Sequence, residues 1–426
     1  MDTQSQKTHI TRRALCAALA ATPILGAGRA RAQANVQLSA MWMGWPESAV
    51  KPLMDWFENE HSGIKVNYQR LPYNELLPAL EVRLGARTPE PDIYSADASL
   101  TASYAARGHL LDLTQEFQSQ FGRFDRAALD AASYKGKLFA GPFATSSQLL
   151  FINTDRFQEA GVNPPGKEIK DRWTWEQILD AAQKLAKPQD NLWGLAIEQS
   201  DRPYQLLPLM QSKGAQVVSE DGLKATGYVD SEPFVAATQF YADLFNRARV
   251  APKGLFDIGL VQEVFMTGRS AMLLGGTWNL DVLAARAKFN WIAVPHPYFA
   301  GGKVVTPTGS WQIGVNPRTR NKEAVMKFMH FFMRDDVQAK WFELRPYPPV
   351  LTANWKNLSQ KLGTAPWKIV QYELQNTAVP RPPIPGFREY EELLKLAFRD
   401  IQQGAAVGNR LNRAAREIDR ELAKYR

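Results

Sequence analysis

Residues 306–316 read Thr-Pro-Thr-Gly-Ser-Trp-Gln-Ile-Gly-Val-Asn, a turn that leads into a strand. Pro, Thr and Gly gather in the first half, and Trp311, Ile313 and Val315 then occupy alternate positions, which predicts a loop feeding a strand. A Trp directly after a Gly-Ser turn lies where backbone can approach a ligand and an indole face can be presented to it. The alternative is a core Trp at the start of a buried strand.

Three neighbouring segments place this stretch in a wider pattern. Upstream lie Phe265-Met-Thr-Gly-Arg-Ser-Ala-Met-Leu-Leu-Gly-Gly-Thr-Trp278 and Val294-Pro-His-Pro297, and downstream lies Ala378-Val-Pro-Arg-Pro382. This order resembles the extracellular solute-binding proteins of sugar ABC importers, the maltose/trehalose-binding type. The resemblance covers nearly the whole chain after its first 34 residues. It implies an α/β fold of two lobes, a type II-like periplasmic-binding-protein fold with a hinge and an interlobe cleft.

Length and composition agree with a soluble two-domain protein. The chain has 426 residues, of which 45% are hydrophobic and 22% charged, and this is ordinary for a globular protein. Twelve Trp exceed what packing usually needs and suit a protein that binds flat apolar faces, although core packing is the default for any one of them.

The first 34 residues have the pattern of an export signal. Thr11-Arg12-Arg13 precedes a moderately apolar run, Ala14 to Ala27, as in twin-arginine signals. The run is too short for a membrane span, which needs ~20 apolar residues. Ala30-Arg31-Ala32 or Ala32-Gln33-Ala34 offers a small-x-small cleavage site. Sec export is the alternative, and both routes imply a periplasmic protein.

Cysteine and charge exclude several classes of function. Cys16 is the only cysteine and lies inside this signal, so the mature chain has neither a disulfide nor thiol chemistry. The formal net charge of +8 is spread over many residues, and part of it leaves with the signal. No basic run is interleaved with aromatic residues, so a nucleic-acid partner is not implied.

The opening of the mature chain predicts parallel strands joined by helices. Strands are expected at 36–42, 64–68 and 91–94, with helices near 50–57 and 74–86. This β-α-β-α-β order is typical of an α/β sheet. It also matches the opening of the family.

The remaining elements follow the same periodicities. Gly136–Pro142 and Leu149–Asn153 read as strands around a polar break at Thr145-Ser146-Ser147. Thr174 and Gln177 form a capping-box pattern before a helix at 175–186. Further elements are a strand at 192–197, helices at 233–246 and 259–267, and a helical tail from 390 to 425 with a break near 404–408. The resemblance places lobe 1 at 35–142 and 305–354, and lobe 2 at 143–304 and 355–426.

Recognisable catalytic and metal-binding patterns are missing. His61, His109, His296 and His330 lie outside metal-ligand spacings, so no metal and no cofactor are expected. No nucleophile elbow, Walker A pattern or dinucleotide fingerprint occurs. A pair of catalytic carboxylates cannot be recognised from sequence, so a glycosidase is the enzymatic alternative.

A carbohydrate site needs hydrogen-bonding groups together with flat aromatic faces. The resemblance and the positions of turns and strand ends give these candidates: Trp45, Glu47, Asp97, Ser146, Trp278, Ser310, Trp311 and Arg381. Trp278 and Trp311 match the stacking positions of the family.

Three candidates have equally simple structural interpretations. Glu47 could be a first-turn acid that the helix dipole favours. Asp97 could be the N-cap of the next helix, and Arg381 could form an interlobe or surface salt bridge.

One departure from the family affects the ligand. Where its trehalose- and maltose-binding members carry a Tyr and an Asp in the first crossing, this chain has Ala144 and Ser146. The mid-helix Arg of those members has no match near Leu77–Leu80. The site is therefore less acidic and suits a monosaccharide, a polyol or another glycoside. A phosphorylated or sulfonated sugar is the alternative, because Arg381 then faces fewer carboxylates.

The resemblance implies a monomeric periplasmic protein that binds a small carbohydrate by hinge closure and delivers it to a membrane permease. A glycoside-processing enzyme and a chemoreceptor ligand-presenter remain as alternatives.

Overall fold

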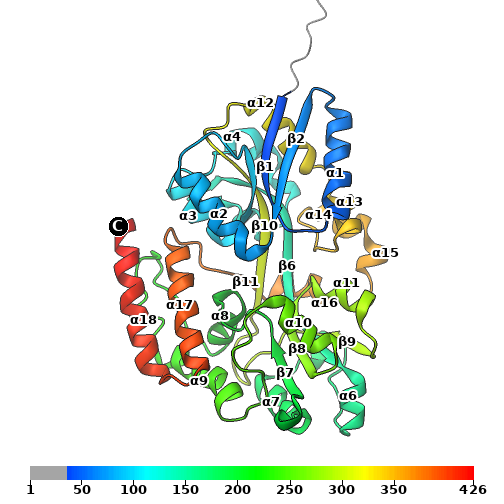
Figure 1. Cartoon of the computed structure of the whole chain (residues 1–426), viewed down its shortest axis with the longest axis vertical. Helices are drawn as coiled ribbons and strands as arrows, with labels where there is room; N and C mark the ends of the chain where they lie inside the picture. Colours follow the sequence, from blue (N-terminus) through cyan, green and yellow to red (C-terminus); the bar gives the residue numbers. More distant parts are fainter. Residues whose placement is uncertain (1–35) are drawn as a thin grey trace, which may run out of the picture. The chain divides into compact units, whose positions relative to one another are not determined.

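Two long strands organise the residues that the computed structural model describes, 36–426. They are β6 (Ala140–Asn153) and β10 (Thr306–Val315), which run side by side in Figure 1. The expected export signal, including Arg12, Arg13 and Cys16, lies outside the described residues. Within 36–426, no helix combines the length and apolar character needed to cross a membrane.

β6 is one uninterrupted buried strand of 14 residues. Its first half, to Ser147, pairs antiparallel with β10, and its second half pairs with β8 (Ser270–Gly276) and β9 (Trp291–Val294). The expected polar break at 145–147 is therefore wrong. Thr145, Ser146 and Ser147 lie opposite residues 308–310 of β10, and this pairing satisfies the backbone whatever the side chains are. For the same reason, residues 306–310 belong to strand β10 and not to the expected loop.

The sheet has nine strands, with the order β2-β1-β3-β10-β6-β8-β7. β9 pairs with β6, and β11 (Ala378–Pro380) pairs with β10. The parallel pairing of β1 (Val36–Met43) with β2 (Ile64–Leu71) and β3 (Ile93–Asp97) confirms the predicted β-α-β-α-β opening. β7 (Trp193–Ile197) is parallel to β8.

The other elements of the described chain are helices and one small hairpin. The hairpin is β4 (Ser133–Tyr134) with β5 (Lys137–Leu138). The helices are α1 (Glu47–Glu60), α2 (Tyr73–Gly85), α3 (Thr101–Ala106), α4 (Thr114–Phe117), α5 (Arg126–Ala131), α6 (Thr154–Glu159), α7 (Trp175–Leu185), α8 (Pro203–Ser212), α9 (Glu232–Asn246), α10 (Ile258–Met266), α11 (Asn279–Arg286), α12 (Lys322–Phe332), α13 (Asp335–Leu344), α14 (Thr352–Asn357), α15 (Ser359–Leu362), α16 (Trp367–Asn376), α17 (Phe387–Gln402) and α18 (Val407–Leu422).

The helices whose positions were predicted begin and end within a few residues of those positions. The capping box is confirmed, because the Thr174 side chain accepts from Gln177 N and the Gln177 side chain accepts from Thr174 N. The helical tail is confirmed as α17 and α18, with the break between them. In α18 the buried residues recur along one face, so an amphipathic pattern packs the helix against α17 and α9.

The apolar core is divided rather than continuous. One cluster joins β1 to α1, α12 and α13, and another joins α7, α8, α9, α17 and α18. A third lies around α10, α11 and α16. In Figure 1, β1, β2 and α1 gather at one end of β6 and β10, and β7, α7 and α9 at the other. This is the mixed α/β, two-lobe architecture that the sequence predicted.

Candidate functional site

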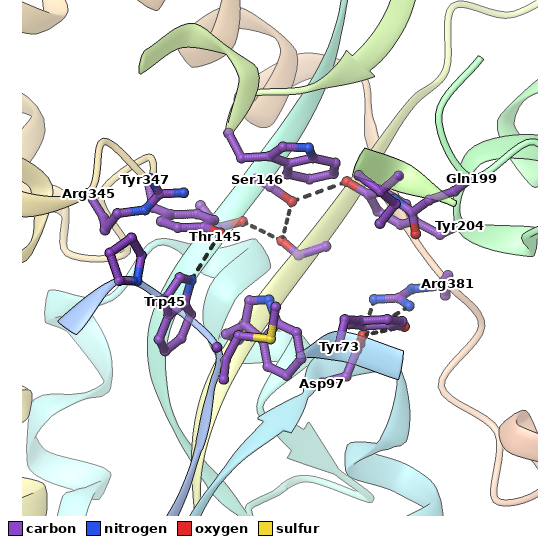
Figure 2. Close-up of a pocket in the computed structure, with 17 residues that line it drawn as sticks. Trp45, Tyr73, Asp97, Thr145, Ser146, Gln199, Tyr204, Arg345, Tyr347 and Arg381 are labelled. Carbon is purple, nitrogen blue, oxygen red and sulfur yellow. Dashed lines mark hydrogen bonds and ion pairs between the residues drawn. The ribbon is translucent and has the colours of Figure 1, made fainter. Parts of the chain in front are cut away.

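A cavity of about 230 Å³ adjoins the middle of β6 and β10. Six aromatic side chains line it: Trp45, Tyr73, Tyr204, Trp278, Trp311 and Tyr347. The polar side chains of its lining are Asp97, Thr145, Ser146, Gln199, Arg345 and Arg381. Figure 2 shows that the labelled side chains come from several segments of the chain and gather around one cavity.

Trp311 lies at an irregularity of β10. The strand pairs Trp311 with Ala144 and Gln312 with Pro142, so Phe143 is an extra residue in β6, a β-bulge. The Trp311 ring meets Trp45 and Tyr73 edge to face, at centroid distances of 6.0 and 5.8 Å. It also packs against two of the core clusters. Both interpretations of this Trp therefore have structural support.

Trp45 is only 3% exposed and forms the floor of the aromatic group. Its Nε1 donates to the Tyr347 hydroxyl at 3.1 Å. Its ring lies 4.9 Å from that of Trp341, with an angle of 71° between the planes. Because the indole N–H already has a partner, Trp45 offers the cavity apolar ring edge rather than a hydrogen bond.

Asp97 ends β3 and is fully engaged by the protein. Its Oδ1 accepts from Ser99 N at 3.0 Å, which confirms that Asp97 is the N-cap of the short helix that follows. Both carboxylate oxygens also accept from Arg381, at 2.5 and 3.3 Å, in an ion pair that is almost completely buried. Burial would lower the pKa of the Arg381 guanidinium, but the negative charges of Asp97 and Glu391 outweigh it and raise the pKa.

Ser146 lies in a chain of hydroxyl groups. Its Oγ donates to Gly309 O at 3.2 Å and lies 3.1 Å from the Tyr204 hydroxyl. Thr145 donates to the same carbonyl oxygen at 3.0 Å. Burial raises the pKa of Tyr204, so its phenol stays neutral and can donate to Ser146.

Trp278 closes the opposite side of the cavity. Its ring lies 6.3 Å from that of Tyr204, tilted by 33°, and its Nε1 donates to Glu198 at 3.1 Å. Trp278 and Tyr204 therefore form one wall, and Trp45, Tyr73 and Trp311 form another.

Glu47 is not part of the cavity lining. It lies in the first turn of α1, accepts from the Tyr68 hydroxyl at 2.6 Å and pairs with Arg70 at 2.8 Å. Arg70 donates in turn to Trp45 O at 2.6 Å, so Glu47 reaches the site only through that arginine. The side chain of Ser310 lies outside the described part of the structure.

Sequence reasoning missed Gln199, Tyr73, Tyr204, Arg345 and Tyr347. Gln199 has a left-handed backbone, with φ 51°, which is uncommon for a residue other than glycine and is often found at functional sites. It directly follows Glu198 at the end of β7, and a ligand-proximal position at a strand end is the one signal that could have found it.

The described residues contain no group of three or more His, Cys, Asp and Glu side chains that could hold a metal ion. Asp97 is the one carboxylate among the described residues that line the cavity, and Arg381 neutralises it. Arg345 likewise pairs with Asp281, at 2.7 Å. The site therefore presents aromatic faces and neutral hydrogen-bonding groups.

Solved structures share this architecture. An ABC substrate-binding protein of Listeria monocytogenes, solved with cycloalternan, superposes with a TM-score of 0.80, at 23% identity, over 92% of this chain and 99% of its own. An ABC transporter solute-binding protein of Thermotoga lettingae, solved with α-D-tagatose, gives a TM-score of 0.80, at 23% identity, over 91% of this chain and 100% of its own.

Sequence comparison leads in the same direction. The sn-glycerol-3-phosphate-binding periplasmic protein of Pectobacterium atrosepticum is 25% identical over 387 residues, which cover 84% of this chain and 82% of that protein. Residues 53–354 match the model of a family described as bacterial extracellular solute-binding protein. Because that match spans well over half of the chain, the protein belongs to the bacterial extracellular solute-binding protein family.

Proposed function

We propose that this protein is the substrate-binding component of an ABC importer and that it binds a small neutral carbohydrate in the cavity. The observation that carries the proposal is the combination of six aromatic side chains with charges that are already paired. Sugars and polyols offer C–H faces for stacking and hydroxyl groups for hydrogen bonds, and this lining complements both.

The size of the cavity supports a small ligand. Its volume of about 230 Å³ is below the roughly 300–1,000 Å³ of sites for drug-sized molecules. A single sugar ring or an open-chain polyol therefore fits better than an oligosaccharide. The tagatose bound by the Thermotoga lettingae protein belongs to this size class.

The number of carboxylates in the cavity favours binding without catalysis. A glycosidase uses two acids, one on either side of the scissile bond. Asp97 is the one carboxylate among the described residues that line this cavity, and both of its oxygens accept hydrogen bonds from Arg381. Purified protein should leave chromogenic glycosides intact, and their turnover would favour the enzymatic alternative.

A thermal-shift screen tests the ligand class. A neutral sugar or polyol at ~100 times its Kd should add ~2.7 kcal/mol to the free energy of unfolding. Calorimetry should then show one site per chain. Binding of a peptide or an amino acid, with no response to any sugar or polyol, would contradict the proposal.

A second candidate is a phosphorylated or other anionic sugar derivative. Arg345 lines the cavity, and its buried Nε has no hydrogen-bond partner among the described residues. The Pectobacterium atrosepticum relative is named for sn-glycerol 3-phosphate. Including that compound in the screen separates the two candidates, since a neutral site gives no shift with it.

Ligand capture in this proposal uses closure of two lobes. Lobe 1 comprises 35–142 and 305–354, lobe 2 comprises 143–304 and 355–426, and β6 and β10 cross between them. Periplasmic binding proteins are known for hinge closure. The closed monomer would then be recognised by the membrane permease.

Export through the twin-arginine route belongs to the same proposal. Arg12 and Arg13 precede a weakly apolar run, as that route requires. Replacing both by Lys should leave precursor in the cytoplasm. Normal periplasmic accumulation of this variant would indicate Sec export.

A further inference from the structure

A buried glutamate stands directly behind one aromatic wall of the cavity. Glu198 follows β7, is 0% exposed and does not line the cavity itself. Its Oε2 accepts from Trp278 Nε1 at 3.1 Å and from Gly276 N at 3.3 Å. Through these two bonds the carboxylate holds both the indole and the turn that carries it.

The carboxylate can approach the turn this closely because the turn contains two glycines. A Cβ added at Gly275 would lie 2.8 Å from Glu198 Oε2 and 2.7 Å from Asn279 Nδ2, and one added at Gly276 would collide with the Trp278 ring. Asn279 donates to Gly276 O at 3.1 Å and accepts from Gln262 at 2.9 Å. Glycines and amides thus surround the acid and fix the geometry of the Gly-Gly-Thr-Trp turn.

The surroundings of Glu198 destabilise its charged form, so packing alone does not explain an acid at this position. The groups that face it are uncharged, namely the side chains of Asn279, Gln262 and Trp278 and the backbone of Gly276. Its Oε1 is buried without a hydrogen-bond partner among the described residues. Burial raises its pKa to about 7. An acid that is buried without a cationic partner destabilises a fold, so its presence beside the candidate site points to a functional role.

We propose that Glu198 is a positioning residue that fixes the Trp278 ring against the ligand and thereby sets the affinity of the site. The inference rests on the proposed function in that it places the ligand in this cavity. Since the indole N–H is held from behind, Trp278 contributes its aromatic face and not a hydrogen bond to the ligand.

A double-mutant cycle tests the proposal on the mature protein with the best sugar or polyol from the screen. Glu198→Leu removes the acceptor, and Trp278→Phe keeps an aromatic face but removes the N–H donor. Glu198→Leu should raise the Kd by roughly 10-fold in the wild-type background. In the Trp278→Phe background it should change the Kd by less than about 2-fold, because the partner has gone. An equal loss in both backgrounds would overturn the proposal.

The conservative variant Glu198→Gln gives a second readout if Glu198→Leu does not fold. Its amide oxygen still accepts from the indole, but more weakly than an ionised carboxylate. The wild-type affinity should therefore rise between about pH 6 and pH 8, whereas that of Glu198→Gln should stay at the wild-type value for about pH 6. Parallel profiles for the two proteins would contradict the role of Glu198.

The two proposals fail in different ways. If wild-type protein binds no carbohydrate, the proposed function is wrong and the cycle is repeated with whatever ligand the screen identifies. If wild-type protein binds a carbohydrate but the Glu198 and Trp278 substitutions act independently, only the positioning role is wrong.

Discussion

Trp311 borders the candidate site and is also part of the packing. Its ring lines the cavity and also packs on two core clusters. Trp311→Ala should weaken ligand binding by about 30-fold or more, as for a hot-spot aromatic, and should also lower apo stability, by less than the ~3–5 kcal/mol expected for a fully buried Trp. Calorimetry and apo denaturation of the same variant measure the two effects. A loss of the whole ~3–5 kcal/mol with unchanged affinity would mean that Trp311 serves core packing only.

Because the pKa of Glu198 is raised by burial, we predict that this residue makes the folded protein less stable as the pH rises. Its pKa rises from an ordinary 4.5 to about 7 in the folded protein. At low pH both states hold the proton, and as the pH rises the unfolded chain releases it first, so this group lowers stability across that range. Glu198→Gln should therefore be more stable than wild type at pH 8, by on the order of 3 kcal/mol, with little difference near pH 4. Denaturant titrations at both pH values measure it, and equal differences at both would refute the assignment.

At the scale of elements, α8 approaches β10 closely enough to require a glycine. A Cβ on Gly309 would lie 2.9 Å from the Tyr204 ring and 3.3 Å from Ser146 Oγ. Gly309→Val should displace Tyr204, break its hydrogen bond with Ser146 and weaken ligand binding by about 10-fold. Gly122→Val is a matched control, because a Cβ there meets nothing within 4 Å. Comparable losses in both variants would show that the effect is not local.

Periodicity predicted most elements well but failed at β6. The polar run 145–147 looks like an interruption, yet its backbone pairs with β10, more than 150 residues away along the chain. Local sequence carries no record of such a partner. The parallel opening and the tail helices were predictable because their apolar periods are complete within each segment.

The candidate site was predictable only in part, for a similar reason. Trp45, Asp97, Ser146, Trp278, Trp311 and Arg381 all line the cavity. Four of them lie at or just after the end of a strand, whereas Ser146 and Trp311 lie inside β6 and β10. Arg345 is the C-cap of α13, and Tyr347 follows two residues later. No pattern in the sequence there indicated that these residues line the cavity. Glu47 lies outside this lining and pairs with Arg70 on β2, a contact that its position in the sequence does not reveal.

At the scale of the whole molecule, several arginines connect elements that we assign to different lobes, including Arg381, which pairs with Asp97, and Arg388, which pairs with Glu81. Arg202, the N-cap of α8, donates to Asn74 at 3.0 Å and lies over the Tyr73 ring at 4.5 Å. Arg345 pairs with Asp281 of α11. Under the proposed lobe closure this contact forms only after the ligand has entered, so Arg202→Ala should speed ligand dissociation by about 5- to 10-fold and leave association nearly unchanged. Stopped-flow fluorescence measures both rates.

The control for this experiment is Lys51→Ala, which removes an exposed ion pair within α1. It should leave both rates at the wild-type values. A slower association of Arg202→Ala, with unchanged dissociation, would mean that Arg202 guides ligand entry instead of retaining the closed form.

The contact between Trp45 and Trp341 has an optical consequence. Two indoles whose centroids are 4.9 Å apart, with planes at 71°, couple their electronic transitions. Such coupling produces adjacent positive and negative bands in circular dichroism. Because Trp45 also borders the cavity, an occupant that shifts its ring changes the splitting and intensity of these bands. In that case the indole pair would serve as an unlabelled spectroscopic reporter of occupancy, read in solution with neither a dye nor an engineered cysteine.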